Sequence, residues 1–277
     1  MNDSDKIAIL IDADNTQPQK LDAIITEVST RGRIVVKRAY GNWKKQNLGK
    51  WEEELKRLGI KAEQQFDYVR GKNATDMALV IDAMDLLSSG SYDSFVIVSS
   101  DSDFTPLAIR LRESGAKVIG IGVQNTPESF RNACDDFLFL ENLTDDEPSE
   151  TSEAPEDEAP ERGDAKTARK EAEKPSNVVP VSPAIALRLP VPPDVHALLV
   201  KAWDSYQNDN ALADVSAAGN YIKRAKPDFD TRTYGYSKLS NLLQSFPERY
   251  ELKRDNNDGS PLKYRCLKPR AVFRLKG

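Results

Sequence analysis

The stretch Lys6–Asn15 reads K-I-A-I-L-I-D-A-D-N, and it decides the fold of the N-terminal half of this 277-residue chain. Its first six residues form an almost continuous apolar run, which is typical of a strand buried on both faces of a sheet. Two aspartates and an asparagine follow that run directly. In parallel sheets, ligands bind beyond the carboxyl ends of the strands, so this stretch predicts both a central strand and a functional edge.

Strand and helix patterns alternate over residues 6–142. Strands are expected at Lys6–Ile11, Arg33–Tyr40, Ile60–Phe66, Phe95–Ser99 and Lys117–Ile121, with a last apolar segment at Phe137–Leu140. Helices are expected at Gln17–Thr30, Leu48–Leu58, Thr75–Ser88 and Phe104–Glu113, with a short one around Ser129–Ala133. This alternation predicts an α/β fold with a mainly parallel sheet, helices on both faces and strand order 3-2-1-4-5.

Charge is distributed unevenly along the chain. The net charge is −5 overall, made up of −4 in residues 1–142, −6 in residues 143–190 and +5 in residues 191–277. The middle segment is rich in Glu, Asp, Pro, Ala and Ser, and we interpret it as a disordered acidic linker. The positive balance of the C-terminal part indicates contact with nucleic acid.

Several classes of protein are excluded by composition. No run approaches 18 apolar residues, so no membrane span is expected, and the polar N-terminus lacks the layout of a signal peptide. The two cysteines, Cys134 and Cys266, lie far apart and predict neither a disulfide framework nor a cysteine-based zinc site. These features favour a cytoplasmic protein.

Four aspartates follow strands or begin helices of the N-terminal domain. Asp12 ends the first strand, Asp101 and Asp103 follow the fourth, and Asp76 lies in the first turn of a helix. Because the carboxyl ends of parallel strands share one edge, we expect these carboxylates to converge, with Asp12 next to Asp101 where the strand order reverses.

Crowded carboxylates raise one another's pKa unless a cation lies between them. An all-oxygen donor set favours Mg²⁺ or Mn²⁺ over zinc, and such a metal can activate water and stabilise a phosphoryl transition state. Polar side chains near the acidic residues are candidates for phosphate contacts: Lys72, Asn73, Ser99, Ser100 and Thr105. An RNA path beside them is predicted from Trp43, Trp51, Lys44, Lys45 and Lys50.

Three motifs, I-D-A-D-N, G-K-N-A-T-D-M-A-L-V-I-D-A-M and S-S-D-S-D-F, resemble in this order the NYN domain, in its LabA-like branch of the PIN-like nuclease superfamily. The resemblance implies a PIN-like three-layer α/β/α fold over residues 1–142 and metal-dependent cleavage of RNA. It maps the acidic site onto Asp12, Asp76 and Asp101 as metal ligands, with Asp103 and Asn15 as helpers.

Two other functions stay open. Asp12-Ala-Asp14 after an apolar strand also resembles the first motif of haloacid-dehalogenase-type phosphatases, although Asn15 stands where that motif has glycine. A non-catalytic RNA-binding adaptor is the third hypothesis. RNA cleavage, turnover of small phosphate monoesters and binding alone distinguish the three.

Residues 191–268 form a second domain, followed by a tail at 269–277. Helices are expected at Asp194–Tyr206, Leu212–Arg224 and Tyr236–Phe246, and strands at Tyr250–Arg254 and Leu262–Leu267, joined by the turn Asn256–Gly259. Three helices and a hairpin predict a small winged-helix, α+β domain.

The stretch Phe229–Leu252 resembles the OST-HTH, or LOTUS, domain, which implies RNA binding or protein partners. Five basic residues gather around the second and third expected helices and are candidates for phosphate contacts: Lys223, Arg224, Lys226, Arg232 and Lys238. Tyr234 and Tyr236 are candidates for stacking on unpaired bases. The sequence leaves open whether the chain forms a homo-oligomer.

Overall fold

The computed structural model describes residues 5–45, 48–66, 74–143, 190–208, 210–254 and 261–267. In the N-terminal part the strands are β1 (Lys6–Asp12), β2 (Arg33–Gly41), β3 (Lys61–Gln64), β4 (Ser94–Val98), β5 (Lys117–Gly122) and β6 (Asp136–Phe139). The α-helices are α1 (Leu21–Ser29), α2 (Trp51–Leu58), α3 (Ala74–Ser88), α4 (Thr105–Glu113) and α5 (Glu128–Ala133).

The six strands form one sheet in the order β3-β2-β1-β4-β5-β6, and all neighbouring strands run parallel. This confirms the predicted order and adds β6 beyond β5. β1 lies in the middle of the sheet, and its side chains from Ile7 to Asp12 are all buried, as the apolar run predicted. Ile11 of β1 is opposite Val98 of β4, so the residues that follow these strands begin side by side at the carboxyl edge.

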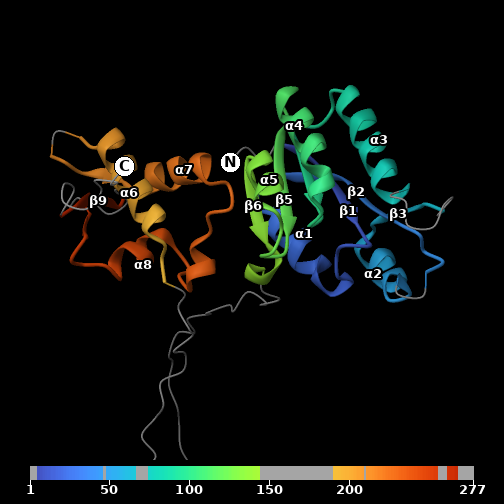
Figure 1. Cartoon of the computed structure of the whole chain (residues 1–277), viewed down its shortest axis with the longest axis horizontal. Helices are drawn as coiled ribbons and strands as arrows, with labels where there is room; N and C mark the ends of the chain where they lie inside the picture. Colours follow the sequence, from blue (N-terminus) through green and yellow to red (C-terminus); the bar gives the residue numbers. More distant parts are fainter. Residues whose placement is uncertain are drawn as a thin grey trace, which may run out of the picture. The chain divides into compact units, whose positions relative to one another are not determined.

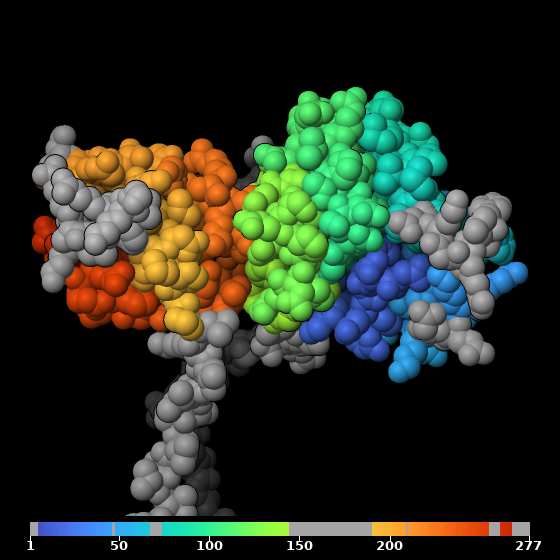
Figure 2. All heavy atoms as spheres, viewed as in Figure 1, coloured from blue at the N-terminus to red at the C-terminus, as the bar shows by residue number. Residues whose placement is uncertain are grey.

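Side chains on the two faces of the sheet pack against different helices. Ile7, Ile9 and Ile11 belong to a core that includes residues of α1 and α2. Ala8 and Leu10 belong to a second core that includes residues of α3, α4 and α5. The helices therefore cover both faces of the sheet (Figure 1), and α3 and α4 lie against each other over the strands (Figure 2). This is the three-layer α/β/α arrangement expected from the sequence.

The C-terminal part combines helices with a small antiparallel sheet. Its elements are α6 (Pro193–Tyr206), β7 (Ala213–Asp214), α7 (Val215–Ala225), the 3-10 helix η5 (Thr231–Tyr234), α8 (Leu239–Gln244), β8 (Tyr250–Lys253) and β9 (Lys263–Cys266). The strands are ordered β7-β9-β8 and pair antiparallel. Leu199, Ile222, Leu242 and Tyr264 contribute to its buried core. This matches the expected winged-helix class, and the predicted turn Asn256–Gly259 lies outside the described residues.

Two expected helices of this domain are shorter in the structure. The predicted helix Leu212–Arg224 is preceded by β7, because Ala213 and Asp214 pair with β9 instead of continuing the helix. The predicted helix Tyr236–Phe246 is shortened to α8 (Leu239–Gln244), because the chain is not helical over residues 236–238 after the left-handed Gly235, with φ of 77°, ends η5. Of the helices among the described residues, none is long and apolar enough to cross a membrane.

Candidate active site

Asp12 is the last residue of β1 and its side chain is completely buried at the carboxyl edge of the sheet. Its Oδ2 accepts hydrogen bonds from Asn15 Nδ2 at 2.7 Å and from Ser99 Oγ at 2.8 Å. Its Oδ1 accepts a hydrogen bond from the backbone N–H of Asp14 at 3.1 Å. Three donors from two segments therefore fix the orientation of the Asp12 carboxylate.

The electrostatic environment of Asp12 opposes its ionisation. Burial raises the pKa of Asp12 above its ordinary value, although the hydrogen bonds from Asn15, Ser99 and the Asp14 backbone act in the opposite direction. The nearby Asp14 carboxylate raises the pKa further. A carboxylate that is held in place but poorly solvated is a strong ligand for a cation, and such perturbed groups gather at functional sites.

Ser99 links the ends of β1 and β4. Its Oγ donates to Asp12 and also accepts a hydrogen bond from the backbone N–H of Asp101 at 3.1 Å. Asp101 in turn accepts a hydrogen bond from the backbone N–H of Asp103 at 2.9 Å, which caps the 3-10 helix η3 (Ser102–Phe104). The predicted neighbours Asp12 and Asp101 are thus connected through one serine hydroxyl.

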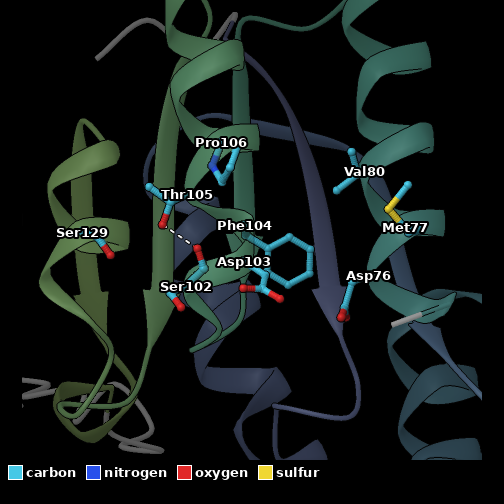
Figure 3. A pocket seen from close by; sticks show the side chains of 9 residues that line it. All are labelled: Asp76, Met77, Val80, Ser102, Asp103, Phe104, Thr105, Pro106 and Ser129. Carbon is cyan, nitrogen blue, oxygen red and sulfur yellow. Dashed lines mark hydrogen bonds between the residues drawn. The ribbon is translucent and has the colours of Figure 1, made fainter. Parts of the chain in front are cut away.

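A hollow of about 560 Å³ lies between α3, the start of α4 and the first turn of α5. Figure 3 shows the carboxylates of Asp76 from α3 and Asp103 from η3 facing this hollow from different sides. Its lining consists of Asp76, Met77, Val80, Ser102, Asp103, Phe104, Thr105, Pro106 and Ser129. Acidic groups therefore border a recess that is otherwise partly apolar.

The pKa of Asp76 is raised to about 6. Burial is the largest cause, and the negative charges of Asp12, Asp101, Asp14 and Asp103 follow in that order. The carboxylates that the sequence predicts at one edge are therefore within electrostatic range of Asp76, although they come from separate segments.

The donor chemistry of this edge suits a hard divalent cation. The side chains offer oxygen atoms, and the mutual repulsion felt by Asp76 is what a divalent cation relieves. In the part of the chain that the structure describes, no three acidic, histidine or cysteine side chains converge closely enough to hold a metal ion. Magnesium commonly keeps several water ligands and takes only one or two carboxylates from the protein, so the residues fit a hydrated cation better than a closed cage.

The remaining polar residues predicted for the site differ in their exposure and in their hydrogen-bond partners. Asn15 is exposed and bonded to Asp12, and Thr105 lines the hollow while its Oγ1 donates to the carbonyl of Ser102 at 2.6 Å. Ser100 Oγ accepts a hydrogen bond from the backbone N–H of Val123 at 3.0 Å. Lys72 and Asn73 lie outside the described residues.

The structure corrects the role predicted for Ser99. Its side chain is buried, and both of its hydrogen bonds are made inside the site to Asp12 and to the Asp101 backbone. A buried hydroxyl that is already committed to two partners is not available to a phosphate. Ser99 instead orients the Asp12 carboxylate and holds the backbone at Asp101.

One basic residue near the acidic edge was not in the predicted site. Lys45 Nζ lies 3.4 Å from both carboxylate oxygens of Asp14, in the segment that follows β2. The cluster Trp43-Lys44-Lys45 is the sequence signal for this lysine, and it predicts Lys45 only as part of the RNA path beside the acidic residues. Trp51, assigned to the same path, is instead buried in the core beside α1.

The basic residues predicted for RNA binding in the C-terminal domain lie on or after α7 and before α8. Arg224 and Lys238 are exposed, and Lys223 precedes Arg224 in the last turn of α7. Lys226 forms an ion pair with Asp194 at 2.8 Å, and Arg232 forms one with Asp230 at 2.7 Å. These ion pairs lower the local positive charge, so Arg224 and Lys238 are the best placed of the set for phosphate contacts.

The structure corrects the stacking role predicted for Tyr234 and Tyr236. Both rings are buried in the core of the C-terminal domain, with exposed fractions of 9% and 8%. Tyr236 also accepts a hydrogen bond from Ser245 Oγ at 2.9 Å. Rings packed in this way hold η5 and α8 in place and present no open face to a base.

Comparison with protein families identifies the class that this fold and acidic edge define. Residues 6–141 match the family model of the NYN domain, and residues 191–261 match that of the OST-HTH/LOTUS domain. The chain therefore carries an NYN domain followed by an OST-HTH/LOTUS domain. NYN domains are PIN-like nuclease domains, and OST-HTH/LOTUS domains are associated with RNA binding.

Similar individual proteins add little about function. The uncharacterized protein MJ0482 of Methanocaldococcus jannaschii is 29% identical over 123 residues, which cover 43% of this chain and 48% of that protein. The chain thus matches about half the length of that relative.

Two solved structures are also similar. The protein of unknown function VPA0982 from Vibrio parahaemolyticus is 19% identical with a TM-score of 0.42, covering 50% of this chain and 94% of its own. An uncharacterized protein from locus NE0665 of Nitrosomonas europaea is 24% identical with a TM-score of 0.28, covering 38% of this chain and 100% of its own. With TM-scores this low, neither structure bears on the function of the chain.

Proposed function

We propose that this chain is an endoribonuclease that depends on Mg²⁺ or Mn²⁺. In this proposal the NYN domain hydrolyses RNA phosphodiesters and the OST-HTH domain binds RNA. The observation that carries the proposal is the carboxyl edge itself, where Ser99 joins the buried Asp12 carboxylate of β1 to the Asp101 backbone after β4, and where both charges help to raise the pKa of Asp76 on α3. Carboxylates at the carboxyl edge of a parallel sheet, beside an open hollow, suit phosphoryl chemistry.

Each side chain has a distinct task in this proposal. A hydrated cation would lie among Asp12, Asp76 and Asp101, bound directly by one or two of them and through water by the rest. Asn15 and Ser99 keep the Asp12 carboxylate in its orientation. Asp103 is exposed and lines the hollow, and in this proposal it would accept a proton from the attacking water. A bound divalent cation supplies positive charge that offsets the charge developing on the phosphate.

Cleavage of a labelled RNA panel by the purified full-length chain tests the proposal. The panel contains single-stranded, hairpin and fully paired RNA, each incubated with Mg²⁺, Mn²⁺ or EDTA. We expect internal cleavage with either cation and none with EDTA, because the carboxylates need the cation to tolerate a phosphate.

Three outcomes contradict the proposal. Equal cleavage with and without EDTA rejects the cation requirement. Turnover of p-nitrophenyl phosphate without RNA cleavage favours a phosphatase. RNA binding without cleavage across both cation titrations favours an adaptor.

RNA binding by the C-terminal domain has its own test. The double variant Arg224→Gln/Lys238→Gln removes two exposed cations, and we expect it to bind all RNA sequences more weakly. The slope of log K against log salt concentration should also become shallower by about 2, one for each lost phosphate contact. Fluorescence anisotropy in EDTA at several KCl concentrations measures both quantities. Lys201→Gln, an exposed position on α6, is the matched control, and an equal loss in that variant contradicts the assignment.

A further inference from the structure

An exposed aromatic ring lies just beyond β3, at the same edge of the sheet as the acidic residues. Phe66 follows the strand by two residues and is 49% exposed. The other large apolar side chains of the described residues that are exposed to this degree are Val35, Met77, Ile81, Ile109, Tyr206 and Leu267. Phe66 is the aromatic member of this group in the NYN domain, and a ring left in water at a ligand-binding edge suits stacking.

The segment beside Phe66 is held by specific hydrogen bonds. Gln64 Oε1 accepts a hydrogen bond from the backbone N–H of Trp43 at 3.1 Å, and its Nε2 donates to Asn42 Oδ1 at 3.1 Å. The backbone N–H of Gln65 donates to the carbonyl of Gly41 at 2.9 Å. The end of β3 and the segment after β2 therefore form one ordered surface around the ring.

Two lysines connect this ring to the acidic edge. Lys44 Nζ lies 5.0 Å from the centroid of the Phe66 ring, within the range of a cation–π contact. The next residue, Lys45, forms an ion pair with Asp14, which is two residues from Asp12. Since β3 and β1 are separated by β2, the strand that leads to Phe66 lies roughly 10 Å across the sheet from the strand that carries Asp12.

We propose that Phe66 and Lys44 form a subsite for one unpaired nucleotide of the RNA substrate. The base stacks on the Phe66 ring, and Lys44 contacts the phosphate of the same nucleotide. This arrangement combines a π-face with an adjacent positive charge, the pairing by which proteins bind single-stranded nucleic acid without reading its sequence. The proposal rests on the proposed function for its substrate, and it specifies that the NYN domain prefers unpaired RNA.

Photocrosslinking in EDTA tests the subsite without requiring cleavage. The full-length chain is irradiated with single-stranded RNA that contains 4-thiouridine, and crosslinked tryptic peptides are identified by mass spectrometry. We expect a crosslink in the peptide of residues 62–70, which contains Phe66, that is absent with fully paired RNA because paired bases cannot unstack onto the ring. Phe66→Ala should abolish that crosslink, and Phe66→Tyr should retain it.

Affinity gives a second readout. Phe66→Ala should bind single-stranded RNA about tenfold more weakly than the wild type, whereas Phe66→Tyr should bind within about twofold of it. Ile109→Ala is the matched control, since Ile109 is 46% exposed on α4. Lys44→Gln should make the salt dependence shallower by about one.

The outcomes separate this proposal from the wider one. If the wild type cuts RNA with Mg²⁺ but gives no crosslink in residues 62–70, or if Phe66→Ala binds as tightly as the wild type, the subsite is rejected and the nuclease assignment stands. If the wild type neither binds nor cuts RNA, both proposals fail. A crosslink that appears equally with paired RNA also rejects the stacking role.

Discussion

Replacing Asp12 with asparagine is expected to lower the rate of RNA cleavage by more than about 100-fold. Asp12 is the most buried of the proposed ligands and accepts three hydrogen bonds that aim its carboxylate. Replacing a group that merely supports a metal ligand typically costs 10- to 100-fold, so loss of a ligand itself should cost more.

The fold should tolerate this change. An asparagine side chain keeps one acceptor oxygen for the backbone N–H of Asp14, and its new amide group then faces Asn15 and Ser99, where the exposed amide of Asn15 is able to turn its oxygen towards it. Burial opposes the negative charge of Asp12, so a neutral side chain also removes the unfavourable free energy of burying that charge. A loss of activity therefore reports on chemistry and not on unfolding.

Three measurements check the Asp12 prediction. Initial rates are compared with saturating Mn²⁺, thermal unfolding is followed by circular dichroism, and Mn²⁺ binding is measured by calorimetry, where we expect at least a tenfold weaker affinity. Asp85→Asn on the exposed side of α3 serves as the control with the same chemical change. Full activity of Asp12→Asn would remove this residue from the mechanism.

The position of the acidic edge followed from sequence because topology determines it. Parallel strands end at one edge, so Asp12 after β1 and Asp101 after β4 had to approach each other once these strands were neighbours. The continuous apolar run at Lys6–Ile11 identified the central strand for the same reason, since only a strand covered on both faces lacks polar alternation.

Side-chain partners could not be predicted in the same way. Ser99 and Asp12 are 87 residues apart, and their hydrogen bond depends on rotamers that periodicity does not report. Asp82 of α3 is a similar case, since nothing in the sequence indicates that it accepts hydrogen bonds from Arg38 and Tyr40 of β2. Both sets of contacts depend on how the elements pack in three dimensions, which sequence periodicity does not give.

The C-terminal domain shows a second feature that could not be predicted from the sequence. Tyr234 and Tyr236 are interleaved with polar residues in a segment without regular periodicity, which gave no information on which rings are buried. The left-handed Gly235 lies between them and changes the chain direction, so both rings reach the core. An irregular backbone thus brings together two rings that a regular α-helix would point about 200° apart.

Replacing Asp76 with asparagine is expected to lower cleavage at least tenfold and to change its pH dependence. The pKa of Asp76 is raised to about 6, so a fraction of this carboxyl is protonated in mildly acidic solution and unavailable to a cation. The wild-type rate at low Mg²⁺ should therefore fall as the pH drops below about 6. Higher Mg²⁺ should shift that fall to lower pH, because the cation competes with the proton, and the variant should lack this limb of the profile.

The same substitution should stabilise the chain in the absence of a divalent cation. A carboxyl whose folded pKa lies above its unfolded value binds its proton more tightly in the folded state, so folding stability declines as the pH rises from about 4 to about 6. Above about pH 6 Asp76 is ionised, and the whole loss of folding stability that its charge causes is present. Asparagine cannot ionise, so Asp76→Asn should unfold at a higher temperature than the wild type at pH 7.5 in EDTA, with a difference that shrinks towards pH 4.

Opposite signs for activity and stability make this prediction specific. Replacing a residue that only supports packing would lower both the activity and the stability of the protein. Replacing a ligand crowded by Asp12 and Asp101 should instead lower the activity and raise the stability. Adding Mg²⁺ should raise the unfolding temperature of the wild type more than that of Asp76→Asn, because the cation removes the same repulsion that the substitution removes. Asp85→Asn should change neither quantity. If Asp76→Asn is destabilised at pH 7.5, or if Mg²⁺ stabilises both proteins equally, Asp76 is not part of the cation site.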